Sequence, residues 1–347
     1  MPSPEIDLSP HRWVIPPQRS LLARLYRWAL FAQRPTAVSV IAALLWCLWW
    51  PAQGWALDTC GQSPMALQVL GSGGPIADDG RSSSGYIVWV DGKAKVLVDV
   101  GSGTFTRFGQ AQAQFADLDL IALSHFHTDH AAGLPALLKS GYFSPRTRPL
   151  AVAGPTGGGP FPSLEEFLHR LLDREHGAFG YLGGYLDGTA GLVPLRPRTV
   201  IEESDHPTPV YQDDSLTVVG LSVPHGIVPT VAYAITAKGR TVVLGSDQTT
   251  ASPAFSKMAK GADLLLLHAV IPEHAGRAAR ALHAVPSQLA TVAAATQPGQ
   301  LVLSHWMARS LAVQDEILAT VKSAYNGRVT QASDLDCFPL GDKADVQ

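Results

Sequence analysis

One short segment, residues 124–130 with the sequence Ser-His-Phe-His-Thr-Asp-His, constrains this chain more than any other. It places three imidazoles and one carboxylate within six consecutive residues. An apolar run of strand length, residues 118–123, precedes it, and residues 131–138 after it favour a helix. A turn from a strand into a helix can direct alternate side chains into one pocket, which residues two apart on a helix cannot do.

The side chains in this segment point to a catalytic metal centre. Neutral imidazole together with carboxylate is the donor combination of catalytic zinc sites. We expect His125 and His127 to share one metal, while Asp129 and His130 bend round to a second.

The second half of the chain repeats the pattern of an apolar strand followed by a polar side chain. Four residues follow such runs: His225 after 216–223, Asp247 after 241–244, His268 after 263–267 and His305 after 301–304. Runs this apolar indicate strands buried on both faces, hence a sheet covered by helices. Layered α/β proteins build their sites at successive strand ends on one rim. We expect His225 to complete the first metal site, His305 the second, and Asp247 to bridge both.

The order His-x-His-x-Asp-His after a buried strand resembles the metallo-β-lactamase superfamily, and within it the ribonuclease Z branch. The matching pieces span most of residues 66–310: residues 124–130 with 133–135 after them, residues 222–226, His283 ahead of a helix, and residues 301–305 with Arg309 beyond. The resemblance implies an α/β fold, the four-layer αββα metallo-β-lactamase sandwich, and two bound Zn²⁺ ions. Because N/O sites accept several metals, Mn²⁺ and Fe²⁺ stay open.

The resemblance also implies a role for each residue of the site. The expected metal ligands are His125, His127, Asp129, His130, His225, Asp247 and His305. Asp129 and His283 are expected to act in catalysis, and His283 would donate a proton to the leaving oxygen. Asp99 and His268 would lie behind the ligands, with Asp99 orienting the metal-binding loop by hydrogen bonds. Two alternatives stay open: Asp99 as a strand-end acid held by turn amides, and His283 as a helix-start polar residue.

Two departures from the ribonuclease Z pattern bear on function. The family has a Glu directly after the residue matching His268, where it orients the proton donor; here that position is Ala269, which weakens the case for His283 as the donor. The family's tRNA-gripping arm is inserted between the strands after His225 and before Asp247. Only residues 236–240 join those strands here, which is a tight turn without room for an arm.

The first 56 residues predict a signal peptide, and residues 57–347 the hydrolase domain. Five arginines precede an apolar run of 14 residues, 37–50, and small residues follow at 54–56. Such a run is too short to span a bilayer comfortably, so cleavage is favoured and a retained N-terminal membrane anchor is the alternative. No Arg-Arg pair is present, which favours the general secretory route. The protein would then be periplasmic or secreted, without stable membrane insertion after cleavage.

Removing the leader makes the chain more acidic. It leaves 21 of the 26 basic and 27 of the 29 acidic residues, a formal charge of −6. This charge disfavours nucleic acid as a partner, and the missing arm favours a small-molecule ester substrate; a homodimer stays open. Of the three cysteines, Cys60 and Cys337 remain outside the leader. An even pair in an exported protein predicts a disulfide, with two free thiols in an unexported protein as the alternative.

These observations predict an exported di-zinc hydrolase that cleaves a small phosphodiester or sulfate ester with a metal-bound hydroxide. Exported members of the ribonuclease Z branch that look like arylsulfatases or phosphodiesterases favour this class. The alternatives are a lactonase or β-lactamase-type carbonyl hydrolase, the tRNA 3′-processing endoribonuclease that the family implies, and a non-catalytic metal-binding scaffold. Di-iron reductases of the same fold resemble it with a Glu where His127 stands, which argues against redox iron.

Overall fold

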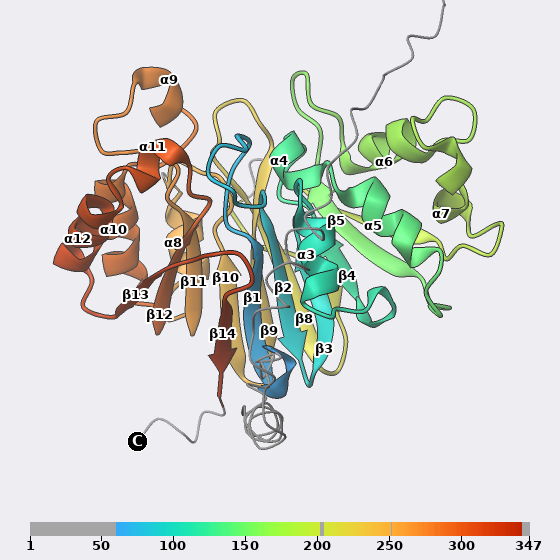
Figure 1. Ribbon diagram of the computed structural model, residues 1–347, viewed down its shortest axis with the longest axis horizontal. Coiled ribbons are helices and arrows are strands. Elements are labelled where there is room, and N and C mark those ends of the chain that lie inside the picture. The colour runs from blue at the N-terminus through green and yellow to red at the C-terminus, as the bar shows by residue number, and fades with distance from the viewer. Residues whose placement is uncertain (1–59, 202–204, 251, 342–347) are drawn as a thin grey trace, which may run out of the picture. The chain divides into compact units, whose positions relative to one another are not determined.

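The computed structural model describes residues 60–201, 205–250 and 252–341 (Figure 1). The leader predicted for residues 1–56 lies outside these ranges, and so do Cys47 and the first residues of the predicted domain. Within the described ranges, no helix combines the length and the apolar character needed to cross a membrane.

Two mixed sheets of seven strands each form the centre of the described domain. The first sheet has the order β14 (Cys337–Leu340), β1 (Met65–Gly71), β2 (Gly85–Val90), β3 (Lys93–Val98), β4 (Leu120–Ala122), β5 (Leu150–Pro155), β6 (Leu195–Val200). The second has the order β13 (Arg328–Gln331), β12 (Gln300–Ser304), β11 (Leu264–His268), β10 (Arg240–Leu244), β9 (Thr230–Ala237), β8 (Leu216–Val223), β7 (Thr208–Gln212).

The two sheets repeat one pattern of strand pairing. In the first, β1, β2 and β3 are antiparallel neighbours, and β3 to β6 pair in parallel. In the second, β8, β9 and β10 are antiparallel neighbours, and β10 to β13 pair in parallel. The strands β14 and β7 each add one antiparallel edge. As a result β3 and β10 occupy equivalent places, and so do β4 and β11.

Two-residue turns join two pairs of antiparallel strands. Asp91 and Gly92 connect β2 to β3 with φ of 49° and 74°, and Lys238 and Gly239 connect β9 to β10 with φ of 53° and 69°. Positive φ at both central residues is the type I′ turn, whose twist matches that of the flanking strands. The β9–β10 turn therefore has no room for an inserted arm.

Helices cover the outer face of each sheet (Figure 1). The first face carries α3 (Thr104–Gln110), α4 (Thr128–Ala131), α5 (Leu134–Gly141), α6 (Leu164–Leu172) and α7 (Gly184–Asp187). The second carries α8 (Pro253–Met258), α9 (Arg277–Arg280), α10 (Pro286–Thr296), α11 (Ala308–Leu311) and α12 (Gln314–Ala324). Short 3₁₀ turns complete the chain: η1 (Cys60–Gln62), η2 (Phe115–Asp117) and η3 (Gly180–Leu182).

Three large hydrophobic clusters make up most of the described interior. One fills the space between the sheets and takes residues from both, such as Val88 and Leu244. The other two lie between each sheet and its helices, around Leu137 on one side and Leu289 on the other. This arrangement is the four-layer αββα sandwich, so the predicted fold class is confirmed.

The helix after the metal-binding segment differs from the prediction. Instead of one helix over residues 131–138, α4 begins at Thr128 and α5 begins at Leu134, with Gly133 between them. The amide of Gly133 donates to Val100 O at 2.7 Å, and a Cβ at this position would lie 2.8 Å from Gly101 O. This close approach to the end of β3 separates the two helices.

A disulfide joins the two ends of the described domain, as the sequence predicts. Cys60 in η1 pairs with Cys337 in β14 across a sequence separation of 277, with Cα atoms 5.6 Å apart. The strand β14 is hydrogen-bonded to β1, so the bridge lies at one edge of the first sheet.

We predict that the double variant Cys60→Ser/Cys337→Ser loses about 2–5 kcal/mol of unfolding free energy, because the crosslink restricts the unfolded chain over a very long loop. Urea unfolding followed by circular dichroism measures this. A reducing agent should lower the midpoint of the wild type and leave that of the double variant unchanged. Equal midpoints for wild type and variant under oxidising conditions would show that the bridge does not stabilise the fold.

Candidate metal centre

The side chains that the sequence singles out meet at one rim of the two sheets. Strand ends from both sheets deliver them: Asp99 follows β3, residues 125–130 follow β4, His225 follows β8, Asp247 follows β10, His268 ends β11 and His305 follows β12. The carboxyl ends of parallel strands lie at the same edge of a sheet, and here the edges of the two sheets face each other. The site therefore depends on both halves of the domain.

Three of these strand ends have an unusual backbone. Asp99, Ser246 and His305 have positive φ values of 59°, 57° and 56°. Non-glycine residues adopt this region at a cost of order 1–3 kcal/mol, and such residues cluster at functional sites. Here the turn directs the polar side chain at or next to each strand end into the space between the sheets.

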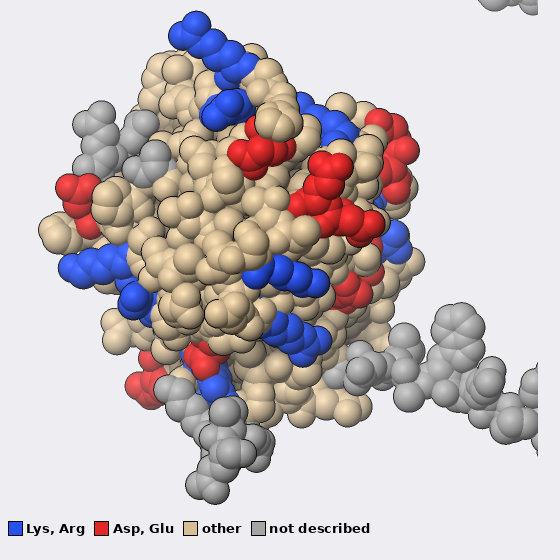
Figure 2. Space-filling model, turned by 90° about the vertical axis from the view of Figure 1, so that its left-hand side faces the viewer, with Lys and Arg blue, Asp and Glu red and all other residues tan. Residues whose placement is uncertain are grey.

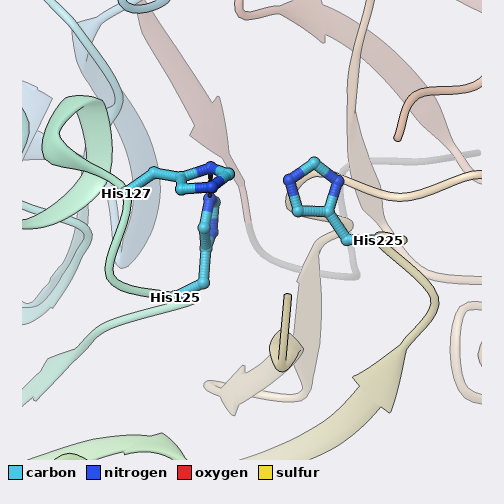
Figure 3. Close-up of side chains that lie close together, drawn as sticks. All are labelled: His125, His127 and His225. Carbon is cyan, nitrogen blue, oxygen red and sulfur yellow. Dashed lines mark hydrogen bonds between the residues drawn. The ribbon is translucent and has the colours of Figure 1, made fainter. Parts of the chain in front are cut away.

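The first cluster consists of His125, His127 and His225, whose ligand atoms all lie within 4.8 Å of one another. His125 Nε2 lies 2.9 Å from His127 Nδ1. Figure 3 shows these two rings on one loop, with the ring of His225 facing them from the other side. The Nδ1 atom of His225 is bound to Leu282 O at 2.7 Å, while its Nε2 is buried without a hydrogen-bond partner among the described residues. That free nitrogen points to an absent ligand.

The second cluster consists of Asp129, His130 and His305, with Asp247 beside it. His130 Nε2 and His305 Nε2 are 3.2 Å apart, and Asp129 Oδ2 lies 3.5 Å and 3.3 Å from them. Asp247 Oδ2 lies 3.7 Å from His130 Nε2, and Asp247 Oδ1 lies 3.6 Å from His305 Nε2. Ligands bound tetrahedrally to zinc at about 2.0–2.1 Å lie about 3.4 Å from one another. Asp129, His130 and His305 therefore fit a single metal ion, and Asp247 has one oxygen within 3.7 Å of each of the two imidazoles.

Asp247 lies between the two clusters. Besides its contacts with the second cluster, its Oδ2 is 3.7 Å from the free Nε2 of His225. One carboxylate within reach of both sets of imidazoles has the placement that a bridging ligand needs. The structure thus brings together all seven predicted ligands.

Asp99 fixes the orientation of the second cluster from behind. Its carboxylate accepts hydrogen bonds from Ser124 N at 2.7 Å and Ser124 Oγ at 2.9 Å, and lies 2.7 Å from His130 Nδ1. An imidazole that donates Nδ1–H to a carboxylate keeps Nε2 free for a metal. The position agrees with the orienting role expected from the sequence.

His268 lies behind Asp247 in the same way, together with a residue that the sequence analysis missed. Its Nδ1 is 2.6 Å from Asp247 Oδ1, and its Nε2 is 3.1 Å from the hydroxyl of Tyr86. Burial lowers the pKa of His268 to about 4, so the ring is neutral and donates Nδ1–H to the carboxylate. Both ring nitrogens are then in use. Tyr86 occupies an ordinary position in β2, and nothing in the sequence distinguishes it from other strand aromatics.

His283 lies at the edge of the centre, with 12% of its side chain exposed. Its Nδ1 is 3.7 Å from Asp247 Oδ2 and has no hydrogen-bond partner among the described residues. Burial lowers the pKa of His283 to about 4. Ala269, which stands where the resemblance expects a Glu, is fully buried and offers no acceptor to orient this ring.

Charges in the centre are strongly coupled. Burial alone lowers the pKa of His130, but the negative charge of Asp99 raises it well above its ordinary value. Burial likewise opposes the charge of His305, whose pKa is nevertheless raised by Asp247. For Asp247, burial raises the pKa and the charge of His305 lowers it well below its ordinary value. Without a metal, the second cluster thus favours a proton on His130, where a cation would bind.

We predict that zinc binding at pH 7 releases at least one proton, because His130 must give up the proton on Nε2 to bind metal. Zinc affinity should therefore rise with pH until the pKa of His130 is passed. Isothermal titration calorimetry in two buffers of different ionisation enthalpy measures the proton count. In Asp99→Asn the count should fall and zinc should bind about 10–100-fold more weakly.

The matched control is Asp91→Asn, which changes an exposed turn residue with positive φ. It should leave both the proton count and the zinc affinity unchanged. A wild-type heat signal independent of the buffer would contradict the protonated state of the second cluster.

Comparison with known proteins gives one consistent family. A family model described as a beta-lactamase superfamily domain matches residues 94–306. Ribonuclease Z from Mycobacterium marinum is 27% identical over 282 residues, which cover 78% of this chain and 96% of that protein. All seven predicted ligands lie inside residues 94–306. The strands β1 and β2 precede the matched residues, and β13 and β14 follow them.

Solved structures share the fold at lower sequence identity. The metallo-beta-lactamase fold protein YhfI from Bacillus subtilis is 21% identical, with a TM-score of 0.60 over 80% of this chain and 99% of that chain. The short form of human tRNase Z is 22% identical, with a TM-score of 0.60 over 80% of this chain and 100% of that chain.

Proposed function

This chain belongs to the beta-lactamase superfamily as a metallohydrolase similar to ribonuclease Z, and we propose that it hydrolyses a phosphodiester or sulfate ester of a small molecule. The observation that carries the proposal is the second cluster, where donor atoms of Asp129, His130 and His305 lie 3.2–3.5 Å apart and Asp247 lies 3.6–3.7 Å from the two imidazoles. A scaffold protein without catalysis would have no need for this set beside a second one.

The donor set fits two divalent ions, and its imidazole-rich composition suits Zn²⁺, with Mn²⁺ or Fe²⁺ as alternatives. When bound, such a pair supplies an activated water and neutralises negative charge on the ester oxygens. The protein's own contribution is to hold the donors in place. Asp99 and His268 fix the ligands from behind, and Leu282 O fixes the ring of His225.

Side chains at the mouth of the site are suited to the organic part of a small ester. Phe161 has its ring 5.9 Å from that of His127, and Ile227, two residues after His225, is 73% exposed. These groups contact apolar parts of a substrate while the ligands contact the reacting centre. The arrangement favours an ester with a compact organic group.

Several features support a small substrate over tRNA. The two-residue turn Lys238-Gly239 replaces any arm, and the chain after residue 56 carries a formal charge of −6. The disulfide between Cys60 and Cys337 favours an oxidising compartment, so we propose export to the periplasm or beyond. Ribonuclease activity, which the name of the Mycobacterium relative denotes, is therefore the less favoured alternative.

The test is hydrolysis of matched chromogenic substrates: bis(p-nitrophenyl) phosphate, p-nitrophenyl sulfate and a chromogenic β-lactam. We predict cleavage of the phosphate or the sulfate, loss of activity with a chelator, and recovery with added zinc. Activity on the β-lactam alone would replace the proposal with a carbonyl hydrolase. Two bound metals without turnover of any of the three would contradict the proposed ester class.

We predict that Asp247→Ala abolishes this turnover and lowers bound metal without unfolding the domain, because the carboxylate lies within reach of both clusters. Metal content by atomic emission and the thermal unfolding midpoint are measured together. The matched control is Asp214→Ala, since Asp214 is exposed in the turn before β8. Full activity in Asp247→Ala would exclude the bridging role.

His283→Gln separates the two interpretations of His283. A proton donor matters most for a poor leaving group, so we predict about a 100-fold loss of kcat on diphenyl phosphate, against a small loss on bis(p-nitrophenyl) phosphate. Release of phenol and of p-nitrophenol, measured separately, gives the two losses. Equal loss for both leaving groups would assign His283 to positioning instead.

A further inference from the structure

The segment between β11 and α10, residues 269–285, lies directly against the first cluster. Leu282 O accepts the hydrogen bond from His225 Nδ1 at 2.7 Å, and His283 follows it in the chain. A Cβ at Gly226 would lie 2.7 Å from Leu282 Cδ2, which shows how closely the two loops approach. Substituents of a substrate bound at His225 therefore extend toward this segment.

The segment is held in place by packing on its inner side. Ala275 and Ala279 pack against the small cluster of Val270, Ile271, Val285 and Met307. The carboxylate of Glu273 binds Ser287 N at 2.9 Å and Ser287 Oγ at 2.6 Å at the start of α10. This carboxylate is therefore directed at the helix start and forms no ion pair with Arg277 or Arg280.

The outer side of the segment carries two arginines without partners. Arg277 and Arg280 are both exposed, and neither forms a hydrogen bond or ion pair through its side chain with any described residue. They are three residues apart on one helical turn, so their guanidinium groups share a face. Figure 2 shows Lys and Arg side chains projecting at the upper end of this side of the molecule, the end at which α9 lies in Figure 1.

A third arginine lies on the same side of the centre. Arg309 donates from Nε to Val270 O at 3.1 Å, is exposed, and has no carboxylate partner among the described residues. Elsewhere in the described domain many arginines are paired, for example Arg107 with Asp334 and Arg240 with Asp263. Three guanidinium groups without a carboxylate partner thus lie on or against residues 269–285, in a chain whose formal charge is negative.

The loop on the side of the second cluster has the opposite character. A cavity of about 310 Å³ there is lined by residues 74–77, 80–83, 102–103 and 128–129. Its arginine, Arg81, is bound to Ser72 Oγ at 2.6 Å and Ala332 O at 2.8 Å, and the neighbouring Asp78 and Asp79 add negative charge. By formal charge, residues 269–285 together with Arg309 are therefore positive, whereas residues 74–83 are negative.

We propose that Arg277 and Arg280, supported by Arg309, bind a second tetrahedral oxyanion of the substrate. The preferred substrate is then an ester that carries an additional phosphate or sulfate group on its organic part. This inference rests on the proposed ester hydrolysis and specifies its substrate class. Guanidinium groups bind such oxyanions through two parallel hydrogen bonds, which gives both affinity and orientation.

Two chromogenic substrates that differ by one phosphate test the inference: thymidine 5′-(p-nitrophenyl phosphate) and its 3′-phosphorylated form. Wild-type zinc-loaded enzyme should cleave the 3′-phosphorylated form with about tenfold higher kcat/KM, because two exposed charge contacts contribute modestly. In Arg277→Gln/Arg280→Gln this preference should disappear, while kcat/KM for the unphosphorylated form stays within about twofold.

The matched control is Arg196→Gln/Arg198→Gln, which removes two exposed arginines from β6 without breaking an ion pair. It should retain the preference, as the net charge changes equally in both variants. Absence of a preference in the wild type, or its equal loss in the control, would overturn the inference.

A binding measurement keeps the inference separate from the proposed activity. Calorimetry compares adenosine 3′,5′-bisphosphate with adenosine 5′-monophosphate as probes for the zinc-loaded protein. Tighter binding of the bisphosphate that is lost in Arg277→Gln/Arg280→Gln and kept in the control supports the oxyanion site even if neither ester is cleaved. In that case only the proposed ester hydrolysis fails. Equal binding of both probes to the wild type overturns the inference whatever the activity.

Discussion

The carboxylate of Asp247 is 2% exposed, and the arrangement of the whole centre depends on how this buried charge is compensated. An ion removed from water costs several kcal/mol unless partners surround it. Here the partners come from four strands: His268 donates from behind, His225 and His305 face it from two sides, and His130 lies within 3.7 Å. Since each partner is itself buried, none can move independently of the others.

The pairing pattern of the sheets explains why these partners meet. Each sheet ends its antiparallel part and begins its parallel part at an equivalent strand, β3 in one and β10 in the other. Asp99 directly follows β3, and Asp247 lies three residues after the end of β10. Asp99 orients the ligand His130, whereas Asp247 lies among the ligands. The two similar sheets therefore contribute different chemistry to the metal centre between them. The left-handed backbone at Asp99 and His305 directs both side chains toward the metal centre.

Much of the metal centre could be predicted from the sequence because its ligands follow recognisable apolar runs. Histidine and aspartate after apolar runs are rare enough that their position on the strands predicts their meeting, and all seven predicted ligands do meet. Tyr86 and the carbonyl of Leu282 could not be predicted, since a strand tyrosine and a backbone oxygen carry no local signal. Their roles arise only from the way the two sheets are packed. The break between α4 and α5 was missed for a similar reason, because it depends on contact of Gly133 with the end of β3.

The disulfide between Cys60 and Cys337 determines what happens to the domain when its backbone is cut. It joins residues 277 positions apart at the edge of the first sheet, so the polypeptide between them is a closed ring. A single cut by a protease at any surface loop opens the ring but releases no fragment. Both sheets, and with them both sets of ligands, remain one molecule after such a cut. In a compartment rich in extracellular proteases, a nicked chain of this kind keeps its two halves at the high local concentration that lets the seam between them close again.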